Sequence, residues 1–558
     1  MKPHNTFLAL MIFLSAEYFG INYLSKTYQT AIVDFLIYSL PLSLLISFSA
    51  ILVLSVMNRY TFAKKFSKVA KKTWIALLLV LLLGFSLRAL TPQTHRIYFD
   101  EDIFENIAQN ILNSGRAILC NYGTPSGCEE YILNKQPNSY SFLLAITYAV
   151  FGVSEAAAFW LNVFIGSVTT FFIFMLAYII FKNEKIALYS SLVFTLTPLH
   201  IIWSATAATE PSMVLFVVLA AISFILYLEI KKISILLLFS FLLIFTFQTR
   251  YESLLLVIPL LTLFLLYGKP VRVLELHGKK FLIIFPLMLI LSTPHLLHLD
   301  YANKDNWGSS GEKLSTKYLG FNLSINTAFF FENTRYPAFF TLVAIIGAIY
   351  SFINNRKAFV FLFSLFTVFF TVYLFFYAGH YNAGVDAKYS LAVAPPLAIF
   401  AGLGFFFLEG KVGKVLPNGY IVIILSILIV FSFFIPYVTT IWKESFAARE
   451  YHEFALRTAE KLNPNCYIFS HVPSMYIVNG KNSAQLWNLN MPQKMENLLE
   501  KTDCIIYDEG YWCQLPAPYN TVGCQNFHSK YNLTLIDRYA VNGSSFVFSL
   551  YYVKNKII

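Results

Sequence analysis

Three acidic residues stand side by side in the run Tyr98-Phe-Asp-Glu-Asp-Ile-Phe-Glu105. Adjacent carboxylates repel one another, which tends to raise the pKa of at least one of them. A carboxylate held in such a place can act as a general base toward a hydroxyl group. A plainer interpretation also fits, because Asp is favoured at helix starts and an amphipathic stretch, Ile103–Ile111, follows. These residues by themselves leave both interpretations open.

Other charged residues stand at the ends of apolar runs. Glu210 precedes Pro211, a pattern typical of a helix start, where a carboxylate can simply favour the helix dipole. Arg250 and Lys388 can be anchors whose long side chains reach the membrane surface, or they can bind an anionic group. His380 and Tyr381 stand near Asp386, although a lone histidine is more often structural.

The composition shows which surroundings these residues have. Of 558 residues, 57% are hydrophobic and only 13% are charged, and the mean hydropathy is +0.61. A soluble fold of this length would need more polar surface, so the chain is predicted to be a multi-pass membrane protein. The net charge of +11 does not indicate nucleic acid, because the Lys and Arg residues fall mostly in short loops between apolar runs.

Hydropathy and basic loops together predict about thirteen membrane-spanning helices, with the N-terminus in the cytoplasm and the C-terminus outside. The predicted spans are 5–24, 31–56, 73–91, 155–181, 187–204, 211–229, 233–249, 251–267, 281–297, 336–353, 358–378, 389–408 and 419–438. Three sequons, at Asn322, Asn532 and Asn542, fall on the predicted outer side and give weak support to this orientation.

Three domains follow from this pattern. Residues 1–72 form a transmembrane hairpin and a basic cytoplasmic loop, and 73–440 form the main helical core with outer loops at 92–154 and 298–335. Residues 441–558 turn polar, so a small extracytoplasmic α/β domain is expected there. Its short β-like runs are Cys466–Ser470, Cys504–Tyr507 and Ser545–Val553, and its helical stretches are Ala447–Lys461 and Pro492–Lys501. The fold class is therefore a mainly α transmembrane bundle with a small α/β domain.

All six cysteines lie on the predicted outer side, where disulfides form. The short separations favour Cys120 with Cys128 and Cys513 with Cys524, although sequence cannot prove the connectivity.

The order of these motifs resembles a known family. Phe99-Asp-Glu-Asp-Ile-Phe104 resembles the first outer loop of protein O-mannosyltransferases and of the lipid A aminoarabinose transferases, both of the GT-C class of membrane glycosyltransferases. Similar landmarks follow along about residues 73–440, where order and topology carry the likeness more than identity does. These are Lys135–Leu143, Phe151–Glu155, Thr197–Ser204, Thr209–Ser212, Gln248–Glu252 and Lys388–Pro396.

The chain also departs from the family. Glu210 stands where Asp is more usual, and the hairpin 5–56 precedes the core. No Trp-Trp-Asp motif occurs in the tail, which disfavours the oligosaccharyltransferase branch.

The resemblance implies transfer of a hexose, mannose-like, from a polyprenyl- or dolichyl-phosphate donor to a protein, glycan or lipid hydroxyl on the outer face of the membrane. Asp100 would be the base, Glu101 would orient the acceptor, and Glu210 would position the sugar or a divalent cation. Arg250, Lys388 and Tyr389 would bind the donor phosphate, and Asp102, His380 and Tyr381 would line the substrate site. The metal requirement stays open.

Two rival functions remain. A transporter with an outer cap domain would carry charged residues near the middle of its spans, whereas a transferase would gather them at one surface. The sequence shows few charges away from span ends, which favours the transferase. A non-catalytic assembly or receptor protein is a third interpretation.

Overall fold

The computed structural model describes residues 3–27, 29–95, 100–267, 270–303, 312–331, 336–381, 386–412, 447–486, 502–515, 524 and 528–556. The chain divides into two compact units. The helical unit consists of Met1–Pro92, Lys135–Tyr140 and Trp160–Lys443, and the sheet unit consists of Gln93–Asn134, Ser141–Phe159 and Glu444–Ile558. The predicted boundaries at residues 72 and 440 divide the chain into consecutive domains, whereas each observed unit combines segments that are distant in the sequence.

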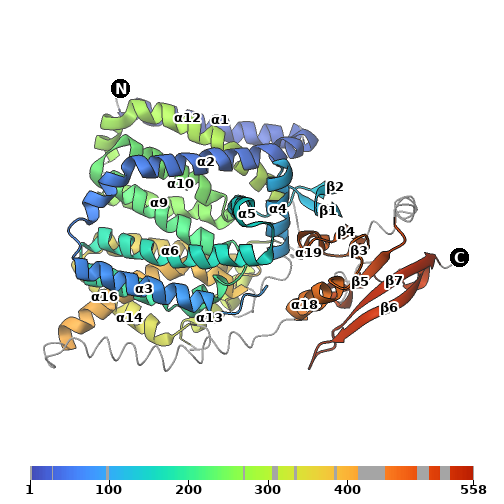
Figure 1. The fold of residues 1–558 in the computed structure, drawn as a ribbon. Helices are drawn as coiled ribbons and strands as arrows, with labels where there is room; N and C mark the ends of the chain where they lie inside the picture. Colours follow the sequence, from blue (N-terminus) through green and yellow to red (C-terminus); the bar gives the residue numbers. More distant parts are fainter. Residues whose placement is uncertain are drawn as a thin grey trace. The chain divides into compact units, whose positions relative to one another are not determined.

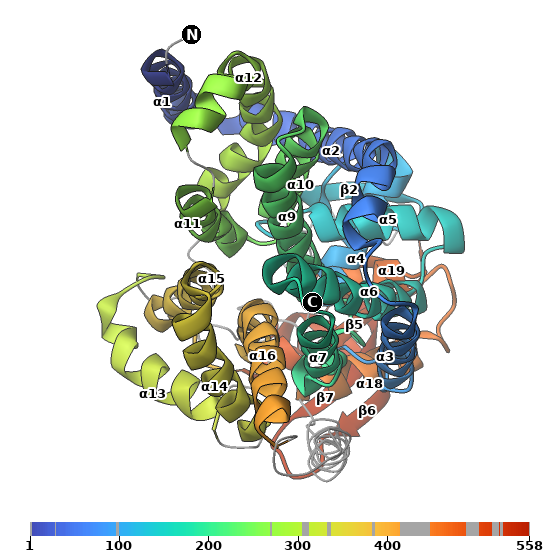
Figure 2. The ribbon, with the colours of Figure 1, turned by 90° about the vertical axis from the view of Figure 1, so that its left-hand side faces the viewer.

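Mostly apolar helices make up the helical unit, and the long ones run side by side (Figures 1 and 2). They are α1 (Pro3–Thr27), α2 (Gln29–Phe66), α3 (Lys71–Ala89), α6 (Glu155–Phe181), α7 (Glu184–Thr195), α8 (Pro198–Trp203), α9 (Glu210–Ile230), α10 (Ile233–Phe247), α11 (Val257–Tyr267), α12 (Pro270–Asn303), α13 (Leu319–Phe329), α14 (Ala338–Asn354), α15 (Arg356–Phe375) and α16 (Ala394–Val412). Short 3₁₀ helices lie at η1 (Tyr251–Leu256), η2 (Thr316–Tyr318) and η3 (Asp386–Val393). The first residues of α6 belong to the sheet unit.

Six of the described helices are long and apolar enough to cross a membrane, and five shorter apolar helices accompany them. The chain is therefore a mainly helical membrane protein, as the hydropathy predicted. Three predicted spans are not continuous α-helices: 187–204 divides into α7 and α8, 251–267 divides into η1 and α11, and 389–408 divides into η3 and α16. Pro198 explains the first break, since proline favours the start of a new helix. The predicted span 419–438 lies outside the described residues.

Glycines let the backbones of α14 and α16 approach each other closely. A Cβ atom built on Gly347 would stand 1.8 Å from the carbonyl oxygen of Phe400, and one built on Gly404 would stand 2.1 Å from that of Val343. In a membrane, helix association depends on this kind of close van der Waals packing between small residues. The pair α14–α16 is therefore held at a distance that no larger side chain permits.

We expect Gly347→Ala to lower the free energy of unfolding by roughly 1–3 kcal/mol, because the added methyl group forces the two backbones apart. Thermal unfolding of the purified protein in detergent measures this change. Gly320→Ala in α13 is the matched control, since nothing lies within 4 Å of its added Cβ. An unchanged melting temperature for Gly347→Ala would show that the two helices separate without cost.

Charged side chains of the helical unit gather at helix ends. Lys65 and Lys182 both contact Glu229 near the end of α9, the latter at 2.9 Å between Nζ and Oε1. Lys185 at the start of α7 lies 2.9 Å from Glu409 near the end of α16. Glu210 stands at the opposite end of α9, about 30 Å away for a helix of this length. This arrangement matches the transferase expectation better than that of a transporter.

The sheet unit combines the first outer loop with the tail. Its helices are α4 (Asp100–Ser114), α5 (Ser139–Phe151, whose first two residues belong to the helical unit), α18 (Ala447–Ala459) and α19 (Pro473–Val478), with a 3₁₀ helix η5 (Tyr511–Gln514). Its strands are β1 (Leu119–Thr124), β2 (Gly127–Ile132), β3 (Tyr467–Ser470), β4 (Asn482–Gln485), β5 (Ile505–Glu509), β6 (Tyr531–Ala540) and β7 (Val547–Lys556). Together they form one seven-stranded sheet in the order β2-β1-β4-β3-β5-β7-β6.

The tail is thus the predicted α/β domain, with the expected strands near 466, 504 and 545 present as β3, β5 and β7. The expected helix at Pro492–Lys501 lies outside the described residues. The sequence did not predict that the first outer loop joins the sheet, where Tyr122 of β1 pairs with Ala484 of β4. Hydropathy reports local character and cannot show which distant segments pair.

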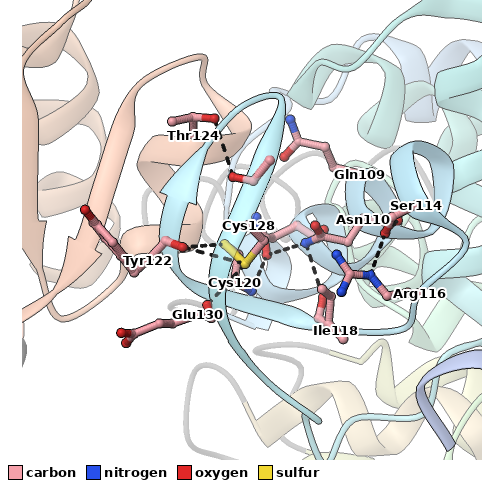
Figure 3. The surroundings of a disulfide bond; sticks show 12 residues. Gln109, Asn110, Ser114, Arg116, Ile118, Cys120, Tyr122, Thr124, Cys128 and Glu130 are labelled. Atoms are coloured by element: carbon pink, nitrogen blue, oxygen red, sulfur yellow. Dashed lines mark hydrogen bonds between the residues drawn. A yellow bond between two sulfur atoms is a disulfide. The ribbon is translucent and has the colours of Figure 1, made fainter. Parts of the chain in front are cut away.

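Three disulfides stabilise the sheet unit: Cys120–Cys128, Cys466–Cys504 and Cys513–Cys524. The first joins β1 to β2 beside Tyr122 (Figure 3). Both predicted pairs are confirmed, and the third disulfide joins the remaining two cysteines, for which no pairing was predicted.

Buried polar contacts also hold the tail together. Asp508 of β5 accepts hydrogen bonds from Ser470 Oγ at 2.7 Å, from Tyr476 at 3.1 Å and from Tyr451. These bonds fasten α18 and α19 to the sheet, because Tyr451 lies in α18 and Tyr476 lies in α19.

The three sequons differ in exposure. Asn532 and Asn542 are exposed, whereas Asn322 is buried and donates a hydrogen bond to the carbonyl of Phe376 at 2.8 Å. Asn322 is therefore closed to glycosylation in the folded chain.

Candidate functional site

A group of paired charges lies at one end of the helical unit. Glu210 begins α9, Arg250 stands between α10 and η1, and Glu252 lies in η1. The guanidinium of Arg250 contacts both carboxylates: Nη1 bonds to Glu210 and Nε bonds to Glu252. All three side chains are mostly buried. Such burial is tolerated only when charges are paired and hydrogen-bonded, so this group is held rigidly.

A second cation and two aromatic rings complete the group. Lys388 of η3 places its Nζ atom 4.0 Å from Glu210 Oε1. The Tyr389 ring lies under both cations, 5.3 Å from the Arg250 guanidinium carbon and 5.6 Å from Lys388 Nζ. Tyr373 of α15 stacks on Tyr389 at 4.5 Å and donates its hydroxyl to Glu252. We name Glu210, Arg250, Glu252, Tyr373, Lys388 and Tyr389 the charged group.

The charged group unites four residues that the sequence predicted: Glu210, Arg250, Lys388 and Tyr389. Glu252 and Tyr373 were not predicted as site residues. Glu252 lay within the quoted motif Gln248–Glu252, so an acidic residue two positions from Arg250 was a usable signal. Tyr373 lies inside a long apolar run, where no sequence signal distinguishes it from the other aromatic residues.

The group can bind an anion without losing its internal pairs. A guanidinium has five N–H donors, and the two carboxylates contact only the Nη1 and Nε atoms of Arg250. Arg and Lys held together favour phosphate oxygens, with Arg supplying a planar fork and Lys a compact charge. The aromatic ring beneath both cations adds cation–π attraction.

The other two predicted substrate-binding residues of this unit lie elsewhere. Tyr381 is fully buried, and its ring packs against Phe329 at 5.4 Å and Phe330 at 6.1 Å. Its backbone N–H donates to Asn326 Oδ1 at 2.7 Å. His380 lies beside the ring of Phe321 at 5.6 Å. These contacts place Tyr381 in a packed aromatic core, and a substrate role for either residue stays a prediction.

The acidic run lies in the sheet unit, where α4 begins at Asp100. Asp100 is half-buried, whereas Glu101, Asp102 and Glu105 are fully buried. Residues three or four positions apart share one helix face, so Glu101, Asp102 and Glu105 all face the interior of the unit. The three adjacent carboxylates are therefore not equivalent, and Asp100 is the one with access to solvent.

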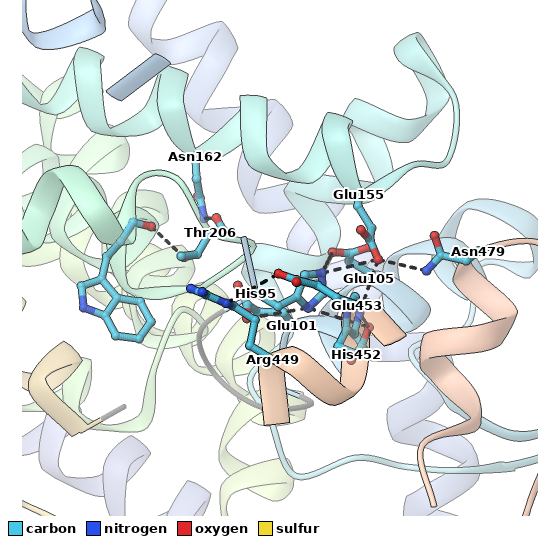
Figure 4. A network of polar contacts seen from close by, with 12 residues as sticks. His95, Glu101, Glu105, Glu155, Asn162, Thr206, Arg449, His452, Glu453 and Asn479 are labelled. Carbon is cyan, nitrogen blue, oxygen red and sulfur yellow. Dashed lines mark hydrogen bonds and ion pairs between the residues drawn. The ribbon is translucent and has the colours of Figure 1, made fainter. Parts of the chain in front are cut away.

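Two histidines lie among the buried carboxylates (Figure 4). The rings of His95 and His452 stack with centroids 4.0 Å apart. His452 Nε2 lies 3.3 Å from Asp102 Oδ1 and 3.5 Å from Glu155 Oε1. His95 Nε2 lies 3.6 Å from Glu155 Oε1 and 3.8 Å from Glu105 Oε1. All of these residues belong to the sheet unit.

Burial and neighbouring charges shift the pKa values of these histidines and carboxylates. Burial, with His452 alongside, holds the pKa of His95 well below its ordinary value, so His95 is neutral. Burial alone would lower the pKa of His452, but Asp102 and Glu155 outweigh it and the pKa rises to about 9. Burial raises the pKa of Asp102 and, helped by its acidic neighbours, raises that of Glu105 well above the usual range.

This second cluster was not predicted from the sequence. His95, Glu105 and His452 were not singled out, and Glu155 entered only as part of a motif. Asp102 and His452 stand 350 residues apart in sequence, so no spacing rule could have paired them.

Several solved structures share this fold over most of the chain, although their sequences differ strongly from it. The oligosaccharyltransferase AglB of Archaeoglobus fulgidus, in complex with an inhibitory peptide and a dolichol-phosphate, has a TM-score of 0.52 and 11% identity, covering 88% of this chain and 75% of its own. The same protein tethered to an acceptor peptide also has a TM-score of 0.52, with 12% identity and coverage of 88% and 74%. ArnT of Cupriavidus metallidurans, bound to undecaprenyl phosphate, has a TM-score of 0.50 and 11% identity, covering 87% and 98%.

The chain thus shares its overall fold with AglB and ArnT, which agrees with the resemblance to GT-C membrane glycosyltransferases seen in its sequence. Residues 135–298 match the family model described as dolichyl-phosphate-mannose-protein mannosyltransferase. The matched segment includes Glu210, Arg250 and Glu252 of the charged group. A search of curated proteins finds no match.

Proposed function

We propose that the protein transfers a mannose-like hexose from a polyprenyl-phosphate carrier to a hydroxyl group of an acceptor on the outer face of the membrane. The observation that carries this proposal is the charged group, in which Arg250 and Lys388 converge on Glu210 over the Tyr389 ring. A lipid phosphate needs cations of this kind at the end of the membrane-spanning helices. The matched family model and the lipid phosphates bound to AglB and ArnT support the same donor class.

The proposed reaction is a single inverting displacement. The acceptor oxygen forms a bond to the anomeric carbon, the bond from that carbon to the phosphate oxygen breaks, and the polyprenyl phosphate leaves. Asp100, the carboxylate of the acidic run with access to solvent, accepts the proton of the attacking hydroxyl. Arg250 and Lys388 stabilise the negative charge that develops on the departing phosphate, and Glu210 holds Arg250 in place.

The proposed orientation follows from the charges of the helical unit. The basic loops at Lys65, Lys182 and Lys185 would face the cytoplasm, and the charged group would face outward. A donor linked to a polyprenyl chain is available on that face, whereas nucleotide sugars are cytosolic. The sheet unit, with its three disulfides, suits the same oxidising compartment.

A transfer assay tests the function. Purified protein in detergent is incubated with radiolabelled polyprenyl-phosphate mannose and a crude extract of its own membranes. We expect label to move into a larger product, whose digestion by protease, glycosidase or lipid extraction then identifies the acceptor class. Folded protein that transfers no label from several hexose donors would contradict the proposal and favour the transporter.

A further inference from the structure

We propose that the sheet unit holds a zinc ion bound by His95, Asp102, Glu155 and His452. One ligand atom from each of these residues lies within 4.8 Å of every other, and they come from four different positions: the segment before α4, α4 itself, the start of α6, and α18.

The spacing of these atoms suits a tetrahedral ion. With zinc–ligand distances near 2.1 Å, neighbouring ligand atoms of a tetrahedral site stand about 3.4 Å apart. The separations from His452 Nε2 to Asp102 Oδ1 and Glu155 Oε1 are 3.3 and 3.5 Å, and that from His95 Nε2 to Glu155 Oε1 is 3.6 Å. Small side-chain movements would therefore be enough to enclose the ion.

Missing hydrogen bonds point to the same conclusion. His95 is buried, with 4% of its surface exposed, and within the described residues neither ring nitrogen has a hydrogen-bond partner. The same holds for Asp102 Oδ2. Buried polar atoms without partners cost free energy, and a bound ion would give His95 Nε2 a partner.

The number of carboxylates around the two histidines also favours a divalent cation. Glu101, Asp102 and Glu105 are fully buried, and Glu155 faces the same two rings. A divalent ion bound among these side chains would compensate the negative charge of the carboxylates that contact it. Two imidazoles with carboxylates suit zinc, whereas magnesium and calcium prefer oxygen ligands only.

The surroundings resemble the outer shell of a metal site. Asn479 of α19 donates its Nδ2 hydrogen to Glu155 Oε1 at 3.0 Å, which fixes the orientation of that carboxylate. A four-ligand site of this kind is closed and structural. It would join α18 of the tail to the start of α4, where Asp100 lies two residues before a ligand.

Metal analysis of the purified full-length protein tests the proposal without any transfer assay. After purification without chelators and desalting, mass spectrometry should find about one zinc per chain. Asp102→Asn, which nearly preserves shape, and His452→Ala should each reduce the zinc content at least tenfold. His528→Ala is the matched control, because this histidine of the same unit is half-exposed and outside the cluster.

Thermal unfolding supplies a second readout that does not depend on how the variants fold. Protein stripped by a chelator should regain its melting temperature with added Zn²⁺ but not with Mg²⁺ or Ca²⁺. Zinc content far below one ion per chain after incubation with Zn²⁺ would overturn the proposal, as would equal zinc in wild type and Asp102→Asn. Either result leaves the proposed transferase activity untouched, since that is measured by label transfer alone.

Discussion

Replacing Asp100 with asparagine should reduce hexose transfer by roughly 10²–10⁴-fold, the typical contribution of a positioned general base. Asparagine preserves the size of the side chain but cannot accept the proton of the acceptor hydroxyl. The loss of one negative charge from the first turn of α4 should cost only about 0.3–1 kcal/mol of stability. Initial rates with radiolabelled donor, together with melting temperatures, separate the two effects.

Glu129→Gln is the matched control for this experiment. Glu129 is an exposed carboxylate of β2, in the same first outer segment as Asp100. Its substitution should leave both rate and melting temperature unchanged. Full turnover of Asp100→Asn would show that Asp100 serves only the start of α4 and that the base lies elsewhere.

Replacing Arg250 with lysine should lower kcat/KM for the lipid-linked donor by about 10²–10³-fold, because the planar fork that contacts Glu210 and Glu252 is lost. The positive charge remains, so the buried carboxylates keep a cationic neighbour and the helical unit should still fold. Polyprenyl phosphate without sugar should inhibit wild-type transfer, and its inhibition constant should rise in Arg250→Lys.

Binding of the inhibitor distinguishes the two proposed roles. Polyprenyl phosphate should bind Asp100→Asn as tightly as wild type, whereas Arg250→Lys should bind it more weakly. Lys185→Gln is the matched control, because Lys185 is an exposed cation of the same unit at a different helix end. Equal affinity of Arg250→Lys and wild type would remove Arg250 from the donor site.

Features encoded locally could be predicted from the sequence. The apolar runs indicated a bundle of membrane-spanning helices, because an apolar helix can cross a bilayer with all its backbone hydrogen bonds made within the helix. The short separations of Cys120–Cys128 and Cys513–Cys524 indicated two disulfides, and both are present. Charged residues at span ends indicated Glu210, Arg250 and Lys388, which the fold gathers into one group.

Hydropathy could not predict where a membrane-spanning segment departs from a continuous α-helix, because it measures only how apolar the residues are. The run 251–267 is apolar throughout most of its length, yet Tyr251–Leu256 forms a 3₁₀ helix before α11. That turn places Glu252 where it meets Arg250 and Tyr373. The position of Glu252 in the charged group thus depends on a local departure from the regular α-helix.

The sequence by itself determined that this chain lies in a membrane and that its tail forms an α/β domain, and it singled out the acidic run and the cations at span ends as candidate site residues. Only the tertiary structure decided that β1 pairs with β4 and that His452 meets Asp102, because such contacts join segments hundreds of residues apart. It also decided that Asp100 is half-exposed while Glu101 and Asp102 are buried. Adjacent residues of the same type differ in this way because a helix turns them toward different surroundings.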